Sequence, residues 1–157
     1  RDDFDDNHRT LNIRNTMFTL IDEGVVPVIN ENDSVSVDEI KIGDNDTLAA
    51  LTATLWNADL MIILSDIDGV FDSDPKSNSN AKLIETVGNA EKLFGSIDIG
   101  GTSSFGTGGI SSKIEAAAKV NQYGIPMILL NGKKTDIIRN CITGTSKGTL
   151  FTGRIEK

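Results

Sequence analysis

Three short runs of consecutive apolar residues stand out along the chain: Val25–Ile29, Leu60–Leu64 and Ile125–Leu130. They are continuous rather than alternating, which is typical of strands buried on both faces of a parallel sheet. A weaker run, Thr149–Phe151, lies near the end. The pattern therefore predicts four strands. Even the fully apolar run Leu60–Leu64 is far shorter than the roughly 20 residues of a membrane-spanning helix.

Between these runs, helical patterns begin near a capping residue and end near a glycine. The helices predicted are 11–21, Thr47–Trp56, Lys113–Tyr123 and Thr135–Cys141, with Asp46 and Ser111 or Ser112 as caps and Gly24, Gly124 and Gly144 at the ends. Strands and helices alternate along the chain. This order implies an α/β domain with a mostly parallel sheet.

Composition and charge narrow the functional classes. The 157 residues carry 15 basic and 23 acidic side chains, a net charge of −8, so no broad basic surface is available for nucleic acid or an anionic membrane. Any phosphate chemistry must use local devices such as helix N-termini, glycine-rich loops and a few lysines. The single cysteine, Cys141, forms no internal disulfide. We expect a cytoplasmic protein.

Two long polar and glycine-rich loops are predicted, Asn30–Asn45 and Ile97–Gly109. Loops of this length in a compact domain are usually functional. Ligands of open α/β sheets bind beyond the carboxyl ends of strands, which is where Ser65 and Asp66 lie. We expect the functional residues to gather at that edge.

The segment Phe105–Lys113 has the composition of a phosphate-binding loop. It is neither a P-loop nor a dinucleotide-binding fingerprint, but its glycines allow backbone N–H groups to converge, and hydroxyls follow them. Lys113 would stand in the first turn of a helix, where the helix dipole disfavours a cation and an anionic partner is expected. The alternative is a flexible loop with a solvated lysine.

Three acidic segments leave alternatives open. Ile29–Ser34 and Gly43–Asp46 could bind an ammonium group or orient a lysine, or they could be ordinary turn and cap residues. The aspartates of Asp66–Asp74 suggest a calcium loop, but Gly69 is misplaced and the terminal glutamate is missing.

Taken together, these segments resemble the glutamate 5-kinases of the amino acid kinase family. The motifs that carry the resemblance are Val28–Asp33, Ile42–Asp46, Leu64–Asp66, Gly106–Lys113 and Gly148–Phe151. The resemblance implies a three-layer αβα sandwich with a mostly parallel sheet. The family's initial lysine- and glycine-bearing strand is absent, so we interpret residues 1–157 as the C-terminal portion of one amino acid kinase domain, with the N-terminal portion missing and no second domain.

The resemblance also implies an activity: ATP-dependent phosphorylation of the side-chain carboxylate of L-glutamate to L-glutamyl 5-phosphate, the first step of proline biosynthesis. Lys113 would stabilise the transferring phosphoryl group, Asp46 would orient the catalytic lysines, and Mg²⁺ would bridge phosphate oxygens with few direct protein ligands. The implied glutamate-binding residues are Asn30, Asp33, Asp44 and Asn45, and the implied ATP-binding residues are Ser65, Asp66, Thr107, Gly108, Gly109, Ile110, Ser111, Ser112 and Lys113.

Members of this family often form homo-oligomers and are inhibited by proline, and both properties are expected here by resemblance. Two alternatives remain: an amino acid kinase with a different acceptor, and a non-catalytic fragment that binds a nucleotide or an amino acid. Because the lysine-bearing strand is absent, the chain alone is predicted to lack full kinase activity.

Overall fold

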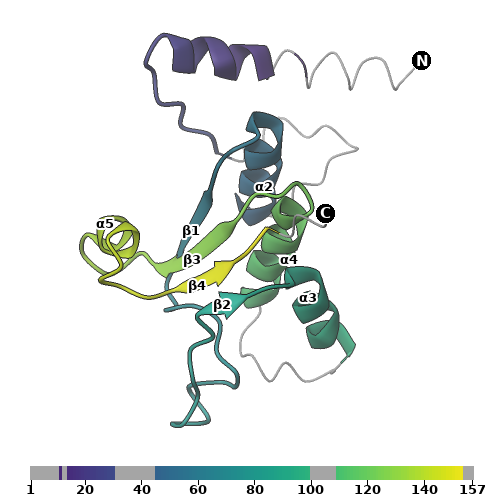
Figure 1. Ribbon diagram of the computed structural model, residues 1–157, viewed down its shortest axis with the longest axis vertical. Coiled ribbons are helices and arrows are strands. Elements are labelled where there is room, and N and C mark those ends of the chain that lie inside the picture. The colour runs from purple at the N-terminus through teal and green to yellow at the C-terminus, as the bar shows by residue number, and fades with distance from the viewer. Residues whose placement is uncertain (1–10, 12–13, 31–44, 100–108, 154–157) are drawn as a thin grey trace. The chain divides into compact units, whose positions relative to one another are not determined.

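The computed structural model describes residues 11, 14–30, 45–99 and 109–153 (Figure 1). The chain divides into two compact units, 1–41 and 42–157, which are described separately. The named elements, all in the second unit, are α2 (Asn45–Trp56), β1 (Met61–Ser65), β2 (Thr86–Val87), α3 (Ala90–Ile99), α4 (Ile110–Asn121), β3 (Met127–Asn131), α5 (Ile137–Ile142) and β4 (Thr149–Phe151).

In the first unit, residues 14–22 are helical and end at Gly24, as predicted. Gly24 has a φ of +73°, and its N–H donates to the Ile21 carbonyl at 2.8 Å. The strand predicted at Val25–Ile29 is wrong: residues 25–30 have no regular secondary structure, and Val28 is 94% exposed. Apolarity alone does not make a strand, because each strand needs a neighbouring backbone to receive its hydrogen bonds.

The second unit is built on a sheet with the strand order β1-β3-β4-β2. β1 pairs in parallel with β3, from Met61 opposite Met127 to Ser65 opposite Asn131, and β2 pairs in parallel with β4. β3 and β4 are antiparallel. The mostly parallel prediction is thus confirmed, with one antiparallel junction.

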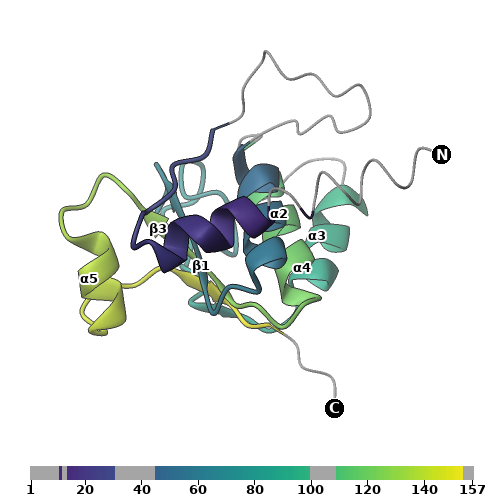
Figure 2. The same ribbon diagram turned by 90° about the horizontal axis from the view of Figure 1, so that it is seen from above.

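Helices cover both faces of this sheet, which confirms the predicted three-layer arrangement. α2, α3 and α4 lie on one face and α5 on the other (Figure 2). α2 packs against α4 through small side chains, since Ala50 and Ala117 are both fully buried. The strands contribute Met127, Leu129 and Phe151, also fully buried, to the same core. This packing fixes the position of the first turns of α2 and α4.

The sequence did not predict β2 and α3. The helix α3 runs to Ile99 and so occupies the beginning of the loop predicted at Ile97–Gly109. Its start carries a recognisable signal: the Asn89 side-chain oxygen accepts the Lys92 N–H at 2.8 Å, which is an N-cap. β2 has only two residues, too few for a periodic pattern to reveal.

Candidate functional site

A pocket of about 390 Å³ lies at the carboxyl ends of β1 and β3. The two strands are parallel, so Ser65 and Asn131, the last residues of each, lie opposite one another at the same edge. The pocket is lined by 65–71, 74–76, Gly109, Ile110, Lys113 and Asn131. The functional edge predicted from the sequence is therefore a concave site in the structure.

The centre of this site is an ion pair between Lys113, in the first turn of α4, and Asp46, in the first turn of α2. The Lys113 Nζ lies 3.0 Å from the Asp46 Oδ2, and the side chains are only 15% and 18% exposed. The Ser112 hydroxyl donates to the same Oδ2 at 2.8 Å. A carboxylate with two charge-assisted bonds and little solvent is held more firmly than an exposed one.

Lys113 also turns back toward the start of its own helix, where its Nζ donates to the Gly109 carbonyl at 3.2 Å. The sequence predicted an anionic partner for a lysine in this unfavourable position. Asp46 is such a partner, supplied by the protein itself. The ammonium is thereby fixed at the rim of the pocket that Lys113 lines.

The capping roles predicted for this region are wrong. α2 begins at Asn45, so Asp46 lies inside the first turn and its carboxylate is directed to Lys113. α4 begins at Ile110 after Gly109, with no side-chain cap, so Ser111 and Ser112 are both within the helix. Within the helix, the Ser112 hydroxyl lies 2.8 Å from the Asp46 Oδ2 and 3.1 Å from the Gly109 carbonyl oxygen.

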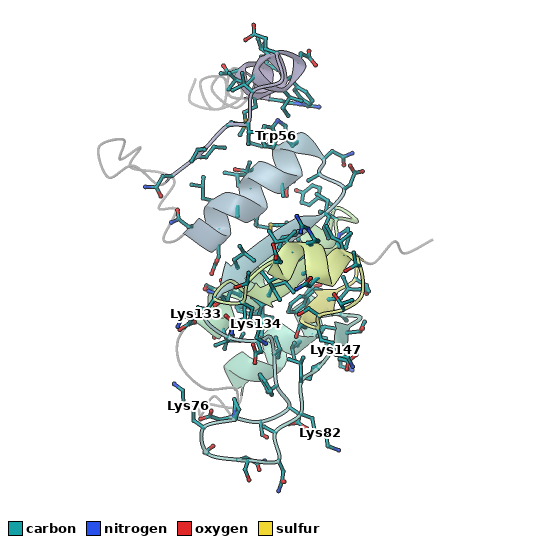
Figure 3. The ribbon with its side chains drawn as sticks, turned by 90° about the vertical axis from the view of Figure 1, so that its left-hand side faces the viewer. Trp56, Lys76, Lys82, Lys133, Lys134 and Lys147 are labelled. Atoms are coloured by element: carbon teal, nitrogen blue, oxygen red, sulfur yellow. The ribbon has the colours of Figure 1, made fainter. Side chains whose placement is uncertain are left out.

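The opposite wall of the pocket is the loop that follows β1. Asp68 on this loop accepts a bond from the Asn131 side-chain amide at 2.9 Å and from the Lys134 Nζ at 2.6 Å. The Lys134 ammonium, and then the Asn131 amide, hold the pKa of Asp68 below its ordinary value. Figure 3 shows Lys134 next to Lys133 on the segment after β3, with Lys76 on the loop after β1. Of these three lysines, Lys76 lines the pocket, together with the carboxylates of Asp66, Asp68 and Asp74.

The calcium-loop alternative gains no support from the described residues. The Asp72 side chain accepts the Lys82 N–H at 2.9 Å, which lowers the pKa of Asp72, and the Asp74 side chain accepts the Lys76 N–H at 2.9 Å. These carboxylates organise the loop backbone. In the described part of the chain, acidic, histidine and cysteine side chains form no group of three able to hold a metal ion.

The predicted site residues fall into several groups. Those that line the pocket are Ser65, Asp66, Gly109, Ile110 and Lys113. Asp46 and Ser112 adjoin them through hydrogen bonds, Ser111 lies in the same turn of α4, and Asn45 begins α2. Asn30 belongs to the first unit. Asp33, Asp44, Thr107 and Gly108 lie outside the described residues.

Asn131, Asp68 and Lys76 also line the pocket but were not predicted. A signal existed for Asn131: it is the polar residue that ends an apolar run, as Ser65 does. In parallel strands such residues meet at one edge. Asp68 and Lys76 come to the pocket only through the course of the loop, which no local pattern reveals.

The amino acid kinase family profile matches residues 1–131. The chain is 62% identical over 151 residues to a glutamate 5-kinase of Alkaliphilus metalliredigens, covering 96% of this chain and 57% of that protein. A glutamate 5-kinase of Clostridium acetobutylicum is 46% identical over the same shares of each chain. The chain therefore spans a little over half the length of these relatives, and the resemblance seen in the motifs is confirmed.

Solved structures support the fold independently. The UMP kinase of Bacillus anthracis matches with a TM-score of 0.63 at 19% identity, over 89% of this chain and 51% of that one. An isopentenyl phosphate kinase of T. acidophilum matches with a TM-score of 0.59 at 23% identity, over 87% and 52%. At such identities the likeness shows the fold alone, and it confirms the predicted architecture.

Proposed function

Because the chain belongs to the amino acid kinase family, we propose that it carries the nucleotide-binding part of an enzyme that phosphorylates the side-chain carboxylate of L-glutamate. ATP would be the donor, and L-glutamyl 5-phosphate, an intermediate on the route to proline, would be the product. The observation that carries this proposal is the Lys113 ammonium, held by Asp46 at 3.0 Å beside a pocket at the carboxyl ends of two parallel strands. The glutamate acceptor rests on the relatives named glutamate 5-kinase.

The residues of the pocket suit a nucleoside triphosphate. Gly109 precedes α4 and among the described residues makes no side-chain cap, so the N–H groups of the first turn would be available to phosphate oxygens. Lys113 and Lys76 add positive charge on the lining. Ser65 and Asp66 offer a hydroxyl and a carboxylate, which suit the hydroxyls of a ribose. In our proposal the phosphate-binding segment also includes Thr107 and Gly108, which directly precede Gly109 in the sequence.

Lys113 would stabilise the charge of the phosphoryl group during transfer. The chemistry requires an oxygen of the glutamate carboxylate to form a bond to the γ-phosphorus while the bond to the leaving ADP oxygen breaks. A carboxylate is ionised at neutral pH, so no general base is needed, and catalysis rests on positioning and charge stabilisation. Asp46 and the Gly109 carbonyl fix the direction of the ammonium before substrate arrives. Pre-organisation of this kind avoids reorientation during the reaction.

Mg²⁺ fits this site as a companion of the nucleotide rather than as an ion held by the protein. By resemblance, the ion would be carried mainly by phosphate oxygens. When bound, it neutralises part of the phosphate charge.

The glutamate-binding role of Asn30, Asp33, Asp44 and Asn45 follows from the motif resemblance. Asn45 supports it structurally, since it directly precedes Asp46 at the start of α2. Carboxylates and amides of this kind would bind the ammonium group of an amino acid. We further propose a cytoplasmic homo-oligomer subject to inhibition by proline, again on resemblance. No helix in the described ranges is long and apolar enough to cross a bilayer.

The decisive experiment measures glutamyl-hydroxamate formation with MgATP by a full-length protein carrying this sequence. We expect product with glutamate and none with acetylglutamate, aspartate or UMP in a parallel ADP-release assay. Turnover with another acceptor alone would refute the glutamate assignment, and nucleotide binding without any turnover would favour a binding module. The 157-residue chain by itself is expected to form no product.

A matched pair of lysine variants on one helix tests the catalytic assignment. Lys113→Met should lower kcat by about 10²–10³, the usual effect of removing a group that stabilises transition-state charge. Lys119, in the last turn of α4, is exposed, so Lys119→Met should leave kcat within about twofold. Equal kcat in the two variants would contradict the role proposed for Lys113.

A further inference from the structure

Thr149, the first residue of β4, is a polar residue in the middle of the core. It is fully buried, yet both hydrogen-bonding functions of its hydroxyl are used. The Thr149 Oγ1 accepts the Val70 N–H at 2.8 Å and donates to the Ile84 carbonyl at 2.7 Å. A buried hydroxyl that is satisfied in both directions fixes the groups around it, because each partner would be left unsatisfied if it moved away.

The two partners belong to opposite arms of one loop. The Ile84 N–H donates to the Val70 carbonyl at 2.8 Å, and a bridge between Phe71 and Leu83 continues the pairing. The Thr149 hydroxyl therefore joins both arms to β4 at one point. Val70 itself lines the pocket, as do the residues on either side of it.

The backbone beside this contact leaves no room for adjustment. Gly69 has a φ of +149°, and a Cβ there would lie 2.5 Å from the Thr149 Oγ1. A Cβ on Gly148 would lie 2.3 Å from the Leu129 carbonyl oxygen. Two glycines thus let the loop and β4 approach closely enough for the hydroxyl to reach both arms.

We infer that Thr149 is a positioning residue, whose buried hydroxyl holds the loop 66–76 as a wall of the nucleotide pocket and thereby sets the affinity for ATP. The part of this inference that concerns ATP rests on the proposed function. Residues 66–71 and 74–76 line the pocket, while Thr149 does not. Its effect must therefore pass through the Val70 backbone, and it should change ATP binding without changing the affinity for glutamate.

The test compares Thr149→Val, which keeps the shape but removes the hydroxyl, with Thr149→Ser, which keeps the hydroxyl, in the full-length protein. In Thr149→Val we expect hydrogen exchange at the Val70 amide to accelerate at least about tenfold and the KM for MgATP to rise about tenfold. The KM for glutamate should stay within about twofold. Thr149→Ser should behave as the wild type in all three measurements.

Thr152→Val is the matched control, because the Thr152 hydroxyl is 3.5 Å from the Val87 carbonyl and does not touch the loop. It should change neither the Val70 amide nor the KM for MgATP. Unchanged ATP affinity in Thr149→Val would overturn the inference, as would weaker ATP binding without faster exchange at Val70. If Thr149→Val does not fold, Thr149→Cys replaces it, since a thiol is a weak hydrogen-bonding group of similar size.

The two proposals can fail separately. A wild-type protein that binds no MgATP would refute the proposed function. The comparison of Val70 exchange in the Val and Ser variants would still decide whether the Thr149 hydroxyl holds the wall. Conversely, normal glutamyl-hydroxamate formation by Thr149→Val with wild-type KM values would overturn the inference and leave the proposed function intact.

Discussion

The ion pair between Lys113 and Asp46 should contribute measurably to stability as well as to catalysis. At 3.0 Å and an effective dielectric constant of about 20, the attraction between two unit charges is about 5.5 kcal/mol before any desolvation. Moving the ammonium and the carboxylate out of most of their water costs free energy, and this cost cancels much of the attraction. With side chains less than one-fifth exposed, a net coupling of about 1.5–3 kcal/mol remains, against about 0.2–1 kcal/mol for an exposed pair.

A double-mutant cycle measures this coupling. The variants are Lys113→Met, Asp46→Asn and the double variant, and the free energy of unfolding is obtained from urea titrations. Trp56 is the single tryptophan of the sequence and ends α2, the helix that carries Asp46, so its fluorescence follows the relevant unfolding. The corresponding decrease in the melting temperature of each single variant is roughly 3–12 °C for a domain of this size.

The control is a second cycle on Lys147 and Glu85, a pair whose side chains are 69% and 57% exposed. Its coupling should not exceed about 1 kcal/mol. A coupling for Lys113 and Asp46 that is no larger than the control value would refute the reasoning, because it would show that partial burial adds nothing to this pair.

Three further predictions concern other parts of the molecule. The pKa of Asp68 is lowered in the folded state, so the difference in unfolding free energy between wild type and Asp68→Asn should be fully present above pH 3.8 and should shrink as the pH falls below that value. A difference that does not depend on pH in urea titrations would contradict the pairing of Asp68 with Lys134. Gly148→Ala should lower the free energy of unfolding by about 1–3 kcal/mol, because the new Cβ would clash with the Leu129 backbone. Gly88→Ala, where a Cβ would meet nothing within 4 Å, should change it by no more than about 0.5 kcal/mol. Equal unfolding midpoints for the two variants would argue against the close approach of Gly148 to Leu129. Asp33→Ala in the full-length protein should raise the KM for glutamate and leave that for ATP unchanged, and the reverse pattern in steady-state kinetics would show that the substrate assignment is wrong.

Local sequence patterns predicted most of the elements because each pattern has a local physical cause. The runs Leu60–Leu64 and Ile125–Leu130 correspond, within about two residues, to β1 and β3. Gly124 and Gly144 do follow their helices with φ of +75° each. The run Val25–Ile29 shows the limit: it is apolar, as most of β1 is, but a strand also requires a partner, which composition does not supply.

The candidate site also combines features that local sequence patterns reveal with features that they do not. The unusual position of Lys113 and the polar residues that end the strands could be recognised from the sequence, because both depend on neighbours within a few positions. Local patterns did not pair Lys113 with Asp46, since Asp46 lies 67 residues away and had the alternative role of an N-cap. Only the family resemblance implied that Asp46 orients the catalytic lysines. Thr149 gave no signal of its function, because its contacts with Val70 and Ile84 span 79 and 65 residues.

Sequence patterns alone establish the α/β class, most helix ends, the acidic character and the motifs shared with glutamate 5-kinases. These follow from periodicity, backbone preferences and residue chemistry, all of which act over short stretches of chain. Three features come from the folding of the whole domain: the antiparallel junction of β3 and β4, the 3.0 Å contact between Lys113 and Asp46, and the buried hydroxyl of Thr149. Each of these joins groups that are distant along the chain, and only packing selects one partner among the many that local chemistry allows.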